Sequence, residues 1–117
     1  MTLPLFNSIA SWLLKKRLHQ IELFVKYPAD VQNELLLKLV DMAAFTEFGT
    51  QYRFDEMETY RQFAERVPIS SYEDLAPMIQ RCREGEQNVF WPTPIKWFAK
   101  SSGTTNAKSK FIPVSQE

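Results

Sequence analysis

The residues most able to do chemistry lie in one short segment near the C-terminal end of the sequence, SSGTTNAKSK from Ser101 to Lys110. The segment combines hydroxyl side chains, a glycine and two lysines. Hydroxyls donate hydrogen bonds to phosphate oxygens, glycine lets backbone N–H groups approach a ligand closely, and lysines supply positive charge. These are the components of a polyphosphate-binding loop. A polar hairpin tip explains the same composition, because Ser, Thr, Gly and Asn are common in turns for conformational reasons.

Two predicted strands flank this segment. Apolar and polar residues alternate over about 95–100, and a second short strand is expected over about 110–114, where Pro113 favours an edge position. An ordinary hairpin turn contains two to five residues, so this connection is unusually long. It lacks the G-x-x-x-x-G-K spacing of a Walker A loop, and no helical pattern follows it.

Helices are predicted before the strands, because apolar residues recur at helical spacing over about 7–25, 29–46, 57–66 and 72–84. The first two are expected to pack as an antiparallel pair, separated at Pro28. Gly49 is the expected left-handed stop of the second helix, and Gly85 that of the last. Ser70 and Glu73 have capping-box spacing, and Pro77 is expected to begin a fresh helix after a short first turn. The predicted fold class is α+β, with N-terminal helices followed by a β-hairpin.

The composition excludes several classes of function. Fourteen Lys and Arg balance fourteen Asp and Glu, so the chain lacks the basic field that nucleic-acid binding needs. No apolar run approaches the roughly 20 residues of a membrane-spanning helix, and no signal peptide is recognised. The single cysteine, Cys82, and the single histidine, His19, provide no metal-ligand cluster of the usual kind. A cytoplasmic protein without nucleic-acid or membrane partners is expected.

Three stretches carry a resemblance to a known family. The segment SSGTTNAKSKFIP resembles the phosphate-binding loop of the acyl-adenylate-forming superfamily that includes firefly luciferase and acyl-CoA ligases. FTEFGTQYRF, FAERVPISSYEDLAPMIQRCREGE and WPTPIKWFAKSSGTT resemble, in order and spacing, the N-terminal region of the Gretchen Hagen family of auxin-responsive acyl-acid amido synthetases. The resemblance covers residues 44–114 strongly, and the first two helices only in general character.

The resemblance implies a set of ligand contacts and a reaction. It places the phosphates of ATP against Ser101, Ser102, Gly103, Thr104 and Thr105, and it makes Lys110 the lysine of the loop. Asn106 stands where the family usually has glycine, and Lys108 has no clear counterpart. The implied reaction uses ATP and magnesium to adenylate a small carboxylic acid and then transfers the acyl group to an amino acid. No catalytic side chain and no magnesium ligand is expected among these residues.

The resemblance also implies that residues 1–117 are the N-terminal portion of the large α/β adenylating domain of a longer enzyme, inactive by itself. The rest of that domain and a C-terminal domain would then be absent. Two alternatives stay open. A fragment of an acyl-CoA ligase would share the loop but transfer the acyl group to a thiol. A non-catalytic helical interaction module would instead bind a partner through aromatic side chains such as Trp12, Phe24, Phe45 and Phe48.

Overall fold

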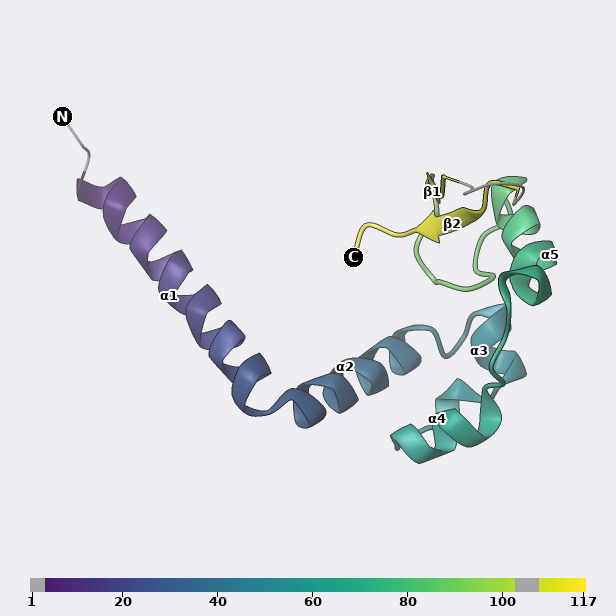
Figure 1. Cartoon of the computed structure of the whole chain (residues 1–117), viewed down its shortest axis with the longest axis horizontal. Helices are drawn as coiled ribbons and strands as arrows, with labels where there is room; N and C mark the ends of the chain where they lie inside the picture. The colour runs from purple at the N-terminus through teal and green to yellow at the C-terminus, as the bar shows by residue number, and fades with distance from the viewer. Residues whose placement is uncertain (1–3, 103–107) are drawn as a thin grey trace. The chain divides into compact units, whose positions relative to one another are not determined.

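The structure is a computed structural model that describes residues 4–102 and 108–117, and it divides into two compact units at Leu35 and Leu36. The chain is α+β, as the sequence predicts. In chain order the elements are α1 (Pro4–Lys26), α2 (Pro28–Met42), α3 (Glu47–Gln51), the 3-10 helix η1 (Phe54–Glu56), α4 (Tyr60–Arg66), α5 (Tyr72–Arg83), β1 (Trp97–Lys100) and β2 (Phe111–Val114) (Figure 1).

The first unit contains α1 and the first half of α2. Only Tyr27 separates these helices, and its backbone is hydrogen-bonded to both. Its N–H donates to the Leu23 carbonyl in α1, and its carbonyl accepts from the Val31 N–H in α2. The expected antiparallel pair is therefore wrong, because a reversal between helices needs a loop of about 2–5 residues. The apolar side chains of α1 are exposed, including Trp12 at 62% and Leu18 at 57%. None of the helices described, over 4–102 and 108–117, is long and apolar enough to cross a membrane.

The second unit holds the hydrophobic core. Val40 in the last turn of α2 is buried with Ala43 and Ala44, which follow the helix, and with Phe54. Partly buried side chains pack around these four residues; they are Leu36, Phe48, Tyr52, Met57, Phe63, Val67 and Trp91. Phe48 also makes edge contacts with the rings of Tyr52 and Phe54, at centroid distances of 4.8 and 5.9 Å. The core thus draws on both the helices and the segment that follows α5.

The short helix α3 was not predicted, and Gly49 lies inside it instead of ending α2. Thr46 is its N-cap: the Oγ1 atom accepts from the Gly49 N–H at 3.0 Å and donates to the Ala43 carbonyl at 2.7 Å. Gly49 packs so closely on the preceding turn that a Cβ atom there would lie 1.9 Å from the Ala43 carbonyl oxygen. Glycine is required here for close approach, not for a left-handed backbone.

Helix α5 begins with a capping box formed by Ser71 and Asp74, one residue later than the expected Ser70 and Glu73. It runs through Pro77 without interruption, so the fresh start expected at that residue is wrong. Proline removes one backbone hydrogen bond from a helix interior. The double cap at one end and buried Ile79 and Cys82 beyond the proline stabilise the helix on both sides of this loss. Gly85 follows the helix with a φ angle of 100°, as a left-handed stop requires.

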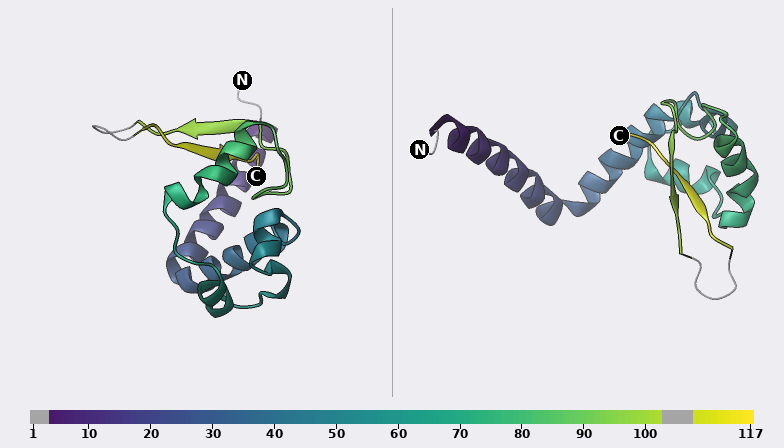
Figure 2. Two further views of the ribbon diagram at one scale, coloured as in Figure 1. Left: turned by 90° about the vertical axis from the view of Figure 1, so that its right-hand side faces the viewer. Right: turned by 90° about the horizontal axis from the view of Figure 1, so that it is seen from above.

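Strands β1 and β2 form an antiparallel hairpin in which Trp97 faces Val114 and Lys100 faces Phe111. Both strands are shorter than predicted. Strand β2 packs against α5 (Figures 1 and 2). The hairpin end formed by Lys100 and Phe111 leads into the hydroxyl-rich segment, so α5 and the two strands together position the candidate site.

Candidate functional site

The predicted phosphate-binding residues divide between described and undescribed parts of the chain. Ser101, Ser102 and Lys110 are described, whereas Gly103, Thr104 and Thr105 lie outside the described residues. Ser101 and Lys110 face each other directly beyond the strands: the Ser101 N–H donates to the Lys110 carbonyl at 2.9 Å, and the Lys110 N–H donates to Ser101 Oγ at 3.2 Å. The hairpin therefore brings the first and last residues of the predicted site together. Ser102 is exposed next to this pair.

The side chain of Lys110 lies over the first turn of α5. Its Nζ atom is 3.8 Å from Glu73 Oε1 and 5.3 Å from the centre of the Tyr72 ring. The lysine is half-buried, and its counter-ion is exposed. Exposed ion pairs of this kind are weak, because water and salt screen them. The ammonium group is thus held near the hairpin end by contacts that an anionic ligand can replace.

Tyr72 joins α5 to the start of β2. Its hydroxyl accepts a hydrogen bond from the Phe111 N–H at 2.9 Å and donates one to the Phe111 carbonyl at 3.2 Å. Neither Tyr72 nor Glu73 was predicted from the sequence to belong to the site. Both residues lie in the segment around the capping box, which was recognised only as a helix start. Tyr72 and Phe111 are 39 residues apart, and spacing within a short segment does not predict such a contact.

Two further cationic side chains, Arg83 and Lys100, lie close to the Phe111 ring. The Arg83 guanidinium carbon lies 3.8 Å from its centre, and Lys100 Nζ lies 5.8 Å from it. Lys110 is the residue before Phe111, so three positive side chains lie at this end of the hairpin, and one of them, Lys110, is 3.8 Å from the Glu73 carboxylate. Such an excess of positive charge attracts anions. The arrangement can neutralise charge on a ligand.

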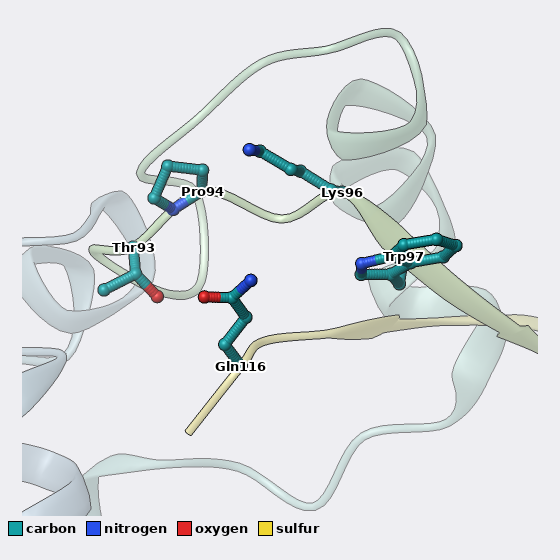
Figure 3. Close-up of a pocket in the computed structure, with 5 residues that line it drawn as sticks. All are labelled: Thr93, Pro94, Lys96, Trp97 and Gln116. Atoms are coloured by element: carbon teal, nitrogen blue, oxygen red, sulfur yellow. The ribbon is translucent and has the colours of Figure 1, made fainter.

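A small pocket lies at the opposite end of the hairpin, where β1 begins. Its volume is about 70 Å³, and the residues that line it are Thr93, Pro94, Lys96, Trp97 and Gln116 (Figure 3). Pockets for drug-sized ligands typically measure about 300–1,000 Å³. This pocket is too small for a nucleotide and is set apart from the hydroxyl-rich segment.

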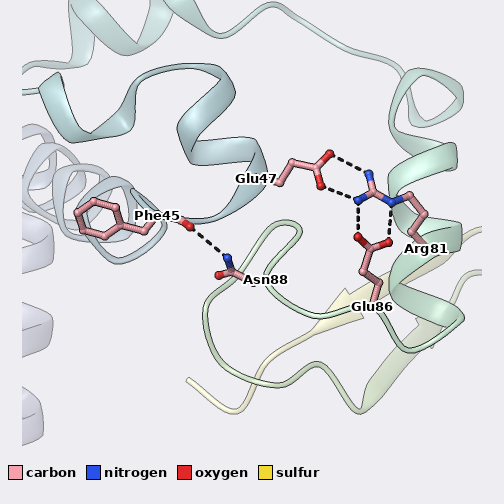
Figure 4. A network of polar contacts seen from close by, with 5 residues as sticks. All are labelled: Phe45, Glu47, Arg81, Glu86 and Asn88. Atoms are coloured by element: carbon pink, nitrogen blue, oxygen red, sulfur yellow. Dashed lines mark hydrogen bonds and ion pairs between the residues drawn. The ribbon is translucent and has the colours of Figure 1, made fainter.

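A polar network joins α5 to α3 and to the loop that follows α5. The Arg81 guanidinium binds both carboxylate oxygens of Glu47, at 2.8 and 2.6 Å, and both oxygens of Glu86 (Figure 4). Hydrogen bonds from Arg81 lower the pKa of Glu47 and of Glu86 and raise that of Arg81. Asn88 adds a hydrogen bond to the Phe45 carbonyl at 3.1 Å. Because the guanidinium already binds two carboxylates, this network holds elements together and leaves Arg81 little capacity for a ligand.

Comparison with known proteins identifies the family. A family model described as the GH3 family N-terminal domain matches residues 17–117. An indole-3-acetic acid-amido synthetase of Arabidopsis thaliana is 32% identical over 103 residues, 87% of this chain and 19% of the relative. A jasmonoyl–L-amino acid synthetase of Nicotiana attenuata is 30% identical over 101 residues, 86% of this chain and 18% of the relative.

A second indole-3-acetic acid-amido synthetase, from Oryza sativa subsp. indica, is 34% identical over 85 residues, 72% of this chain and 14% of the relative. The chain thus spans less than a fifth of the length of each of these relatives. The family model covers residues 17–117, which include the hairpin. The resemblance to the amido synthetase family is therefore confirmed. This chain belongs to the GH3 family, the Gretchen Hagen family of acyl-acid amido synthetases.

Proposed function

We propose that this chain supplies the ATP phosphate-binding hairpin of an acyl-acid amido synthetase. The observation that carries the proposal is the pairing of Ser101 with Lys110 at the end of an antiparallel hairpin, with the hydroxyl-rich segment between them. Membership of the GH3 family and the amido synthetase names of the relatives support it. In this proposal Ser101, Ser102, Gly103, Thr104 and Thr105 donate hydrogen bonds to phosphate oxygens, and Lys110 neutralises their charge.

The proposed reaction has two steps. In the first, a carboxylate oxygen of the acid attacks the α-phosphorus of ATP, the bond from that phosphorus to the bridging oxygen breaks, and pyrophosphate leaves. In the second, the amine of an amino acid attacks the acyl carbon, loses a proton, and displaces AMP. Catalysis of the first step requires positioning and neutralisation of charge on the leaving phosphates. Lys110 and the hydroxyls provide those effects, so the step needs no acid, base or nucleophile from these residues.

Magnesium accompanies ATP in the proposed reaction. Within residues 4–102 and 108–117, no group of three or more His, Cys, Asp or Glu side chains gathers as a metal site. We assign the described residues no step through the ion. Its ligands are expected elsewhere in the longer enzyme.

The substrates are proposed as classes. The relatives are named for amido synthesis with indole-3-acetic acid and for synthesis of jasmonoyl-amino acids, so a small carboxylic acid and an amino acid are the proposed partners. A cytoplasmic location suits ATP-dependent chemistry of this kind. We further expect the 117-residue polypeptide to be inactive alone, because groups that bind adenine, the acyl chain and the amine are expected from the remaining length seen in the relatives.

The test is carboxylate-dependent exchange of pyrophosphate into ATP, measured on the protein at its native length across aromatic, indolic and fatty acids. Exchange is expected with one class of acid. Lys110→Ala and Lys110→Met should each lower the exchange rate about 100-fold, as the loss of one charge-stabilising group typically does. Lys38→Ala removes an exposed lysine on α2 and should leave the rate unchanged. An active Lys110→Ala variant would contradict the proposed role of the lysine.

A second candidate is a helical interaction module, favoured by the exposed apolar side chains of α1, among them Trp12 and Phe24. It predicts neither exchange with any acid nor binding of ATP, in which case the hydroxyl-rich segment is only a polar hairpin tip. An acyl-CoA ligase would show the same exchange as the amido synthetase. The product formed when coenzyme A and amino acids are both supplied separates these two enzymes.

A further inference from the structure

The hydroxyl of Tyr72 binds the outer edge of β2, at the position where a further strand would form hydrogen bonds in a larger sheet. In an antiparallel pair, successive residues point their N–H and C=O groups alternately toward the partner strand and away from it. The Lys110 N–H and C=O both meet Ser101 across the hairpin. Phe111, the next residue, must therefore direct its own N–H and C=O to the outer edge, and there both of them bind Tyr72.

Tyr72 holds the backbone next to Lys110 through one donated and one accepted hydrogen bond. One hydroxyl donates to the Phe111 carbonyl and accepts from its N–H, at 3.2 and 2.9 Å. The ring of the same tyrosine lies 5.3 Å from Lys110 Nζ, and Glu73, the next residue on α5, holds that atom at 3.8 Å. The first turn of α5 thereby controls where the backbone of β2 begins and where the ammonium group lies.

We infer that Tyr72 is a positioning residue for the phosphate-binding lysine, acting through the Phe111 backbone. The inference rests on the proposed function, because it concerns how Lys110 meets the phosphates of ATP. Without the hydroxyl, the ring still packs, but Phe111 loses its two edge hydrogen bonds and the strand can shift on α5. The ammonium group then spends less time where the phosphates bind.

The test compares Tyr72→Phe with Tyr60→Phe in the exchange assay at native length. Both variants remove one phenolic hydroxyl, but Tyr60 is 63% exposed at the start of α4. Tyr72→Phe should raise the KM for ATP about tenfold, the effect expected from losing one or two neutral hydrogen bonds. The KM for the carboxylic acid should not change. Tyr60→Phe should leave both constants as they are in the wild type.

Two further measurements separate positioning from general stability. In a Lys110→Ala background, Tyr72→Phe should cause no additional rise in the KM for ATP, because the lysine through which it acts is gone. Hydrogen exchange at the Phe111 amide should be faster in Tyr72→Phe, since its hydrogen-bond acceptor has been removed. A purely structural role would lower the thermal midpoint and the amount of active enzyme without raising this KM selectively.

Failure of the inference is distinct from failure of the proposed function. If the wild type catalyses exchange and Tyr72→Phe keeps the wild-type KM for ATP, the positioning role is refuted while the function stands. The same holds if the effects of Tyr72→Phe and Lys110→Ala are additive, or if exchange at the Phe111 amide is unchanged. If the wild type neither catalyses exchange nor binds ATP, the proposed function falls and the inference falls with it.

Discussion

Substituting Gly49 by alanine tests the packing of α3 most directly. In an unhindered helix this change stabilises a protein by about 1 kcal/mol, because alanine has the higher helix propensity. Here the new Cβ would lie 1.9 Å from the Ala43 carbonyl oxygen and 2.9 Å from the Ala43 carbonyl carbon. Both atoms belong to the backbone, so no side-chain rotation relieves the overlap, and the turn before α3 must move.

The size of the effect follows from what that movement breaks. The Ala43 carbonyl accepts hydrogen bonds from the Thr46 N–H at 3.1 Å and from Thr46 Oγ1 at 2.7 Å. Each contributes about 1 kcal/mol, and forcing an extra methyl group into a packed site costs about 1–3 kcal/mol. After the gain in helix propensity, Gly49→Ala should lower the free energy of unfolding by about 3 kcal/mol.

The assay is equilibrium denaturation in urea, with Gly85→Ala as the matched control. Gly85 has a φ angle of 100° but open space where a Cβ would stand, so alanine there should cost only about 1 kcal/mol of backbone strain. Gly49→Ala should therefore be the more destabilising change, although Gly49 has no positive φ. If Gly49→Ala proved as stable as the wild type, or less destabilising than Gly85→Ala, the close approach of α3 to Ala43 would be refuted.

Two other predictions concern the contacts that hold α3 in place, namely its N-terminal cap and its ion pair with α5. Thr46→Val removes a fully buried cap and should cost about 2 kcal/mol in urea denaturation, against about 1 kcal/mol for the exposed cap change Thr59→Val; equal costs would contradict it. Because Arg81 lowers the pKa of Glu47 and Glu86, their stabilising contribution is complete above about pH 4.3 and is lost as pH falls through the lowered values. The difference in thermal midpoint between wild type and Arg81→Met should therefore shrink from pH 7 to pH 3, and a constant difference would argue against the network.

The sequence predicted those elements whose signals are local. Apolar residues at helical spacing indicated α1, α2 and α5, and alternation indicated the hairpin. These patterns succeed because neighbouring residues on one face decide them. Gly85 was likewise recognised as a helix stop, since a left-handed residue there needs only its own backbone. The structure pairs Ser101 with Lys110 at the end of that hairpin, whereas their role in phosphate binding stays a prediction.

The sequence failed where distant residues decide the structure. The continuous helix through Pro77 depends on buried side chains beyond the proline, Ile79 and Cys82, that offset a lost hydrogen bond. Gly49 is needed because its backbone lies close to the Ala43 carbonyl. Residue preferences for helices and turns carry no information about such a contact. The contact of Tyr72 with Phe111 joins residues 39 positions apart, so the part of the site contributed by α5 had no signal in the spacing around the hydroxyl-rich segment.

The hydrogen bonds at the start of α3 set an order for folding. The Glu47 and Phe48 N–H groups donate to the Asn88 and Val89 carbonyls at 3.0 and 2.9 Å. An isolated helix of five residues, the length of α3, is unstable in water because nucleation is costly. We therefore expect α3 to be stable during synthesis only after the chain has been made through Val89. Trp91, which also packs on the core, is made two residues later, so we expect Phe48 and Phe54 to stay accessible to chaperones or to aggregation over that interval.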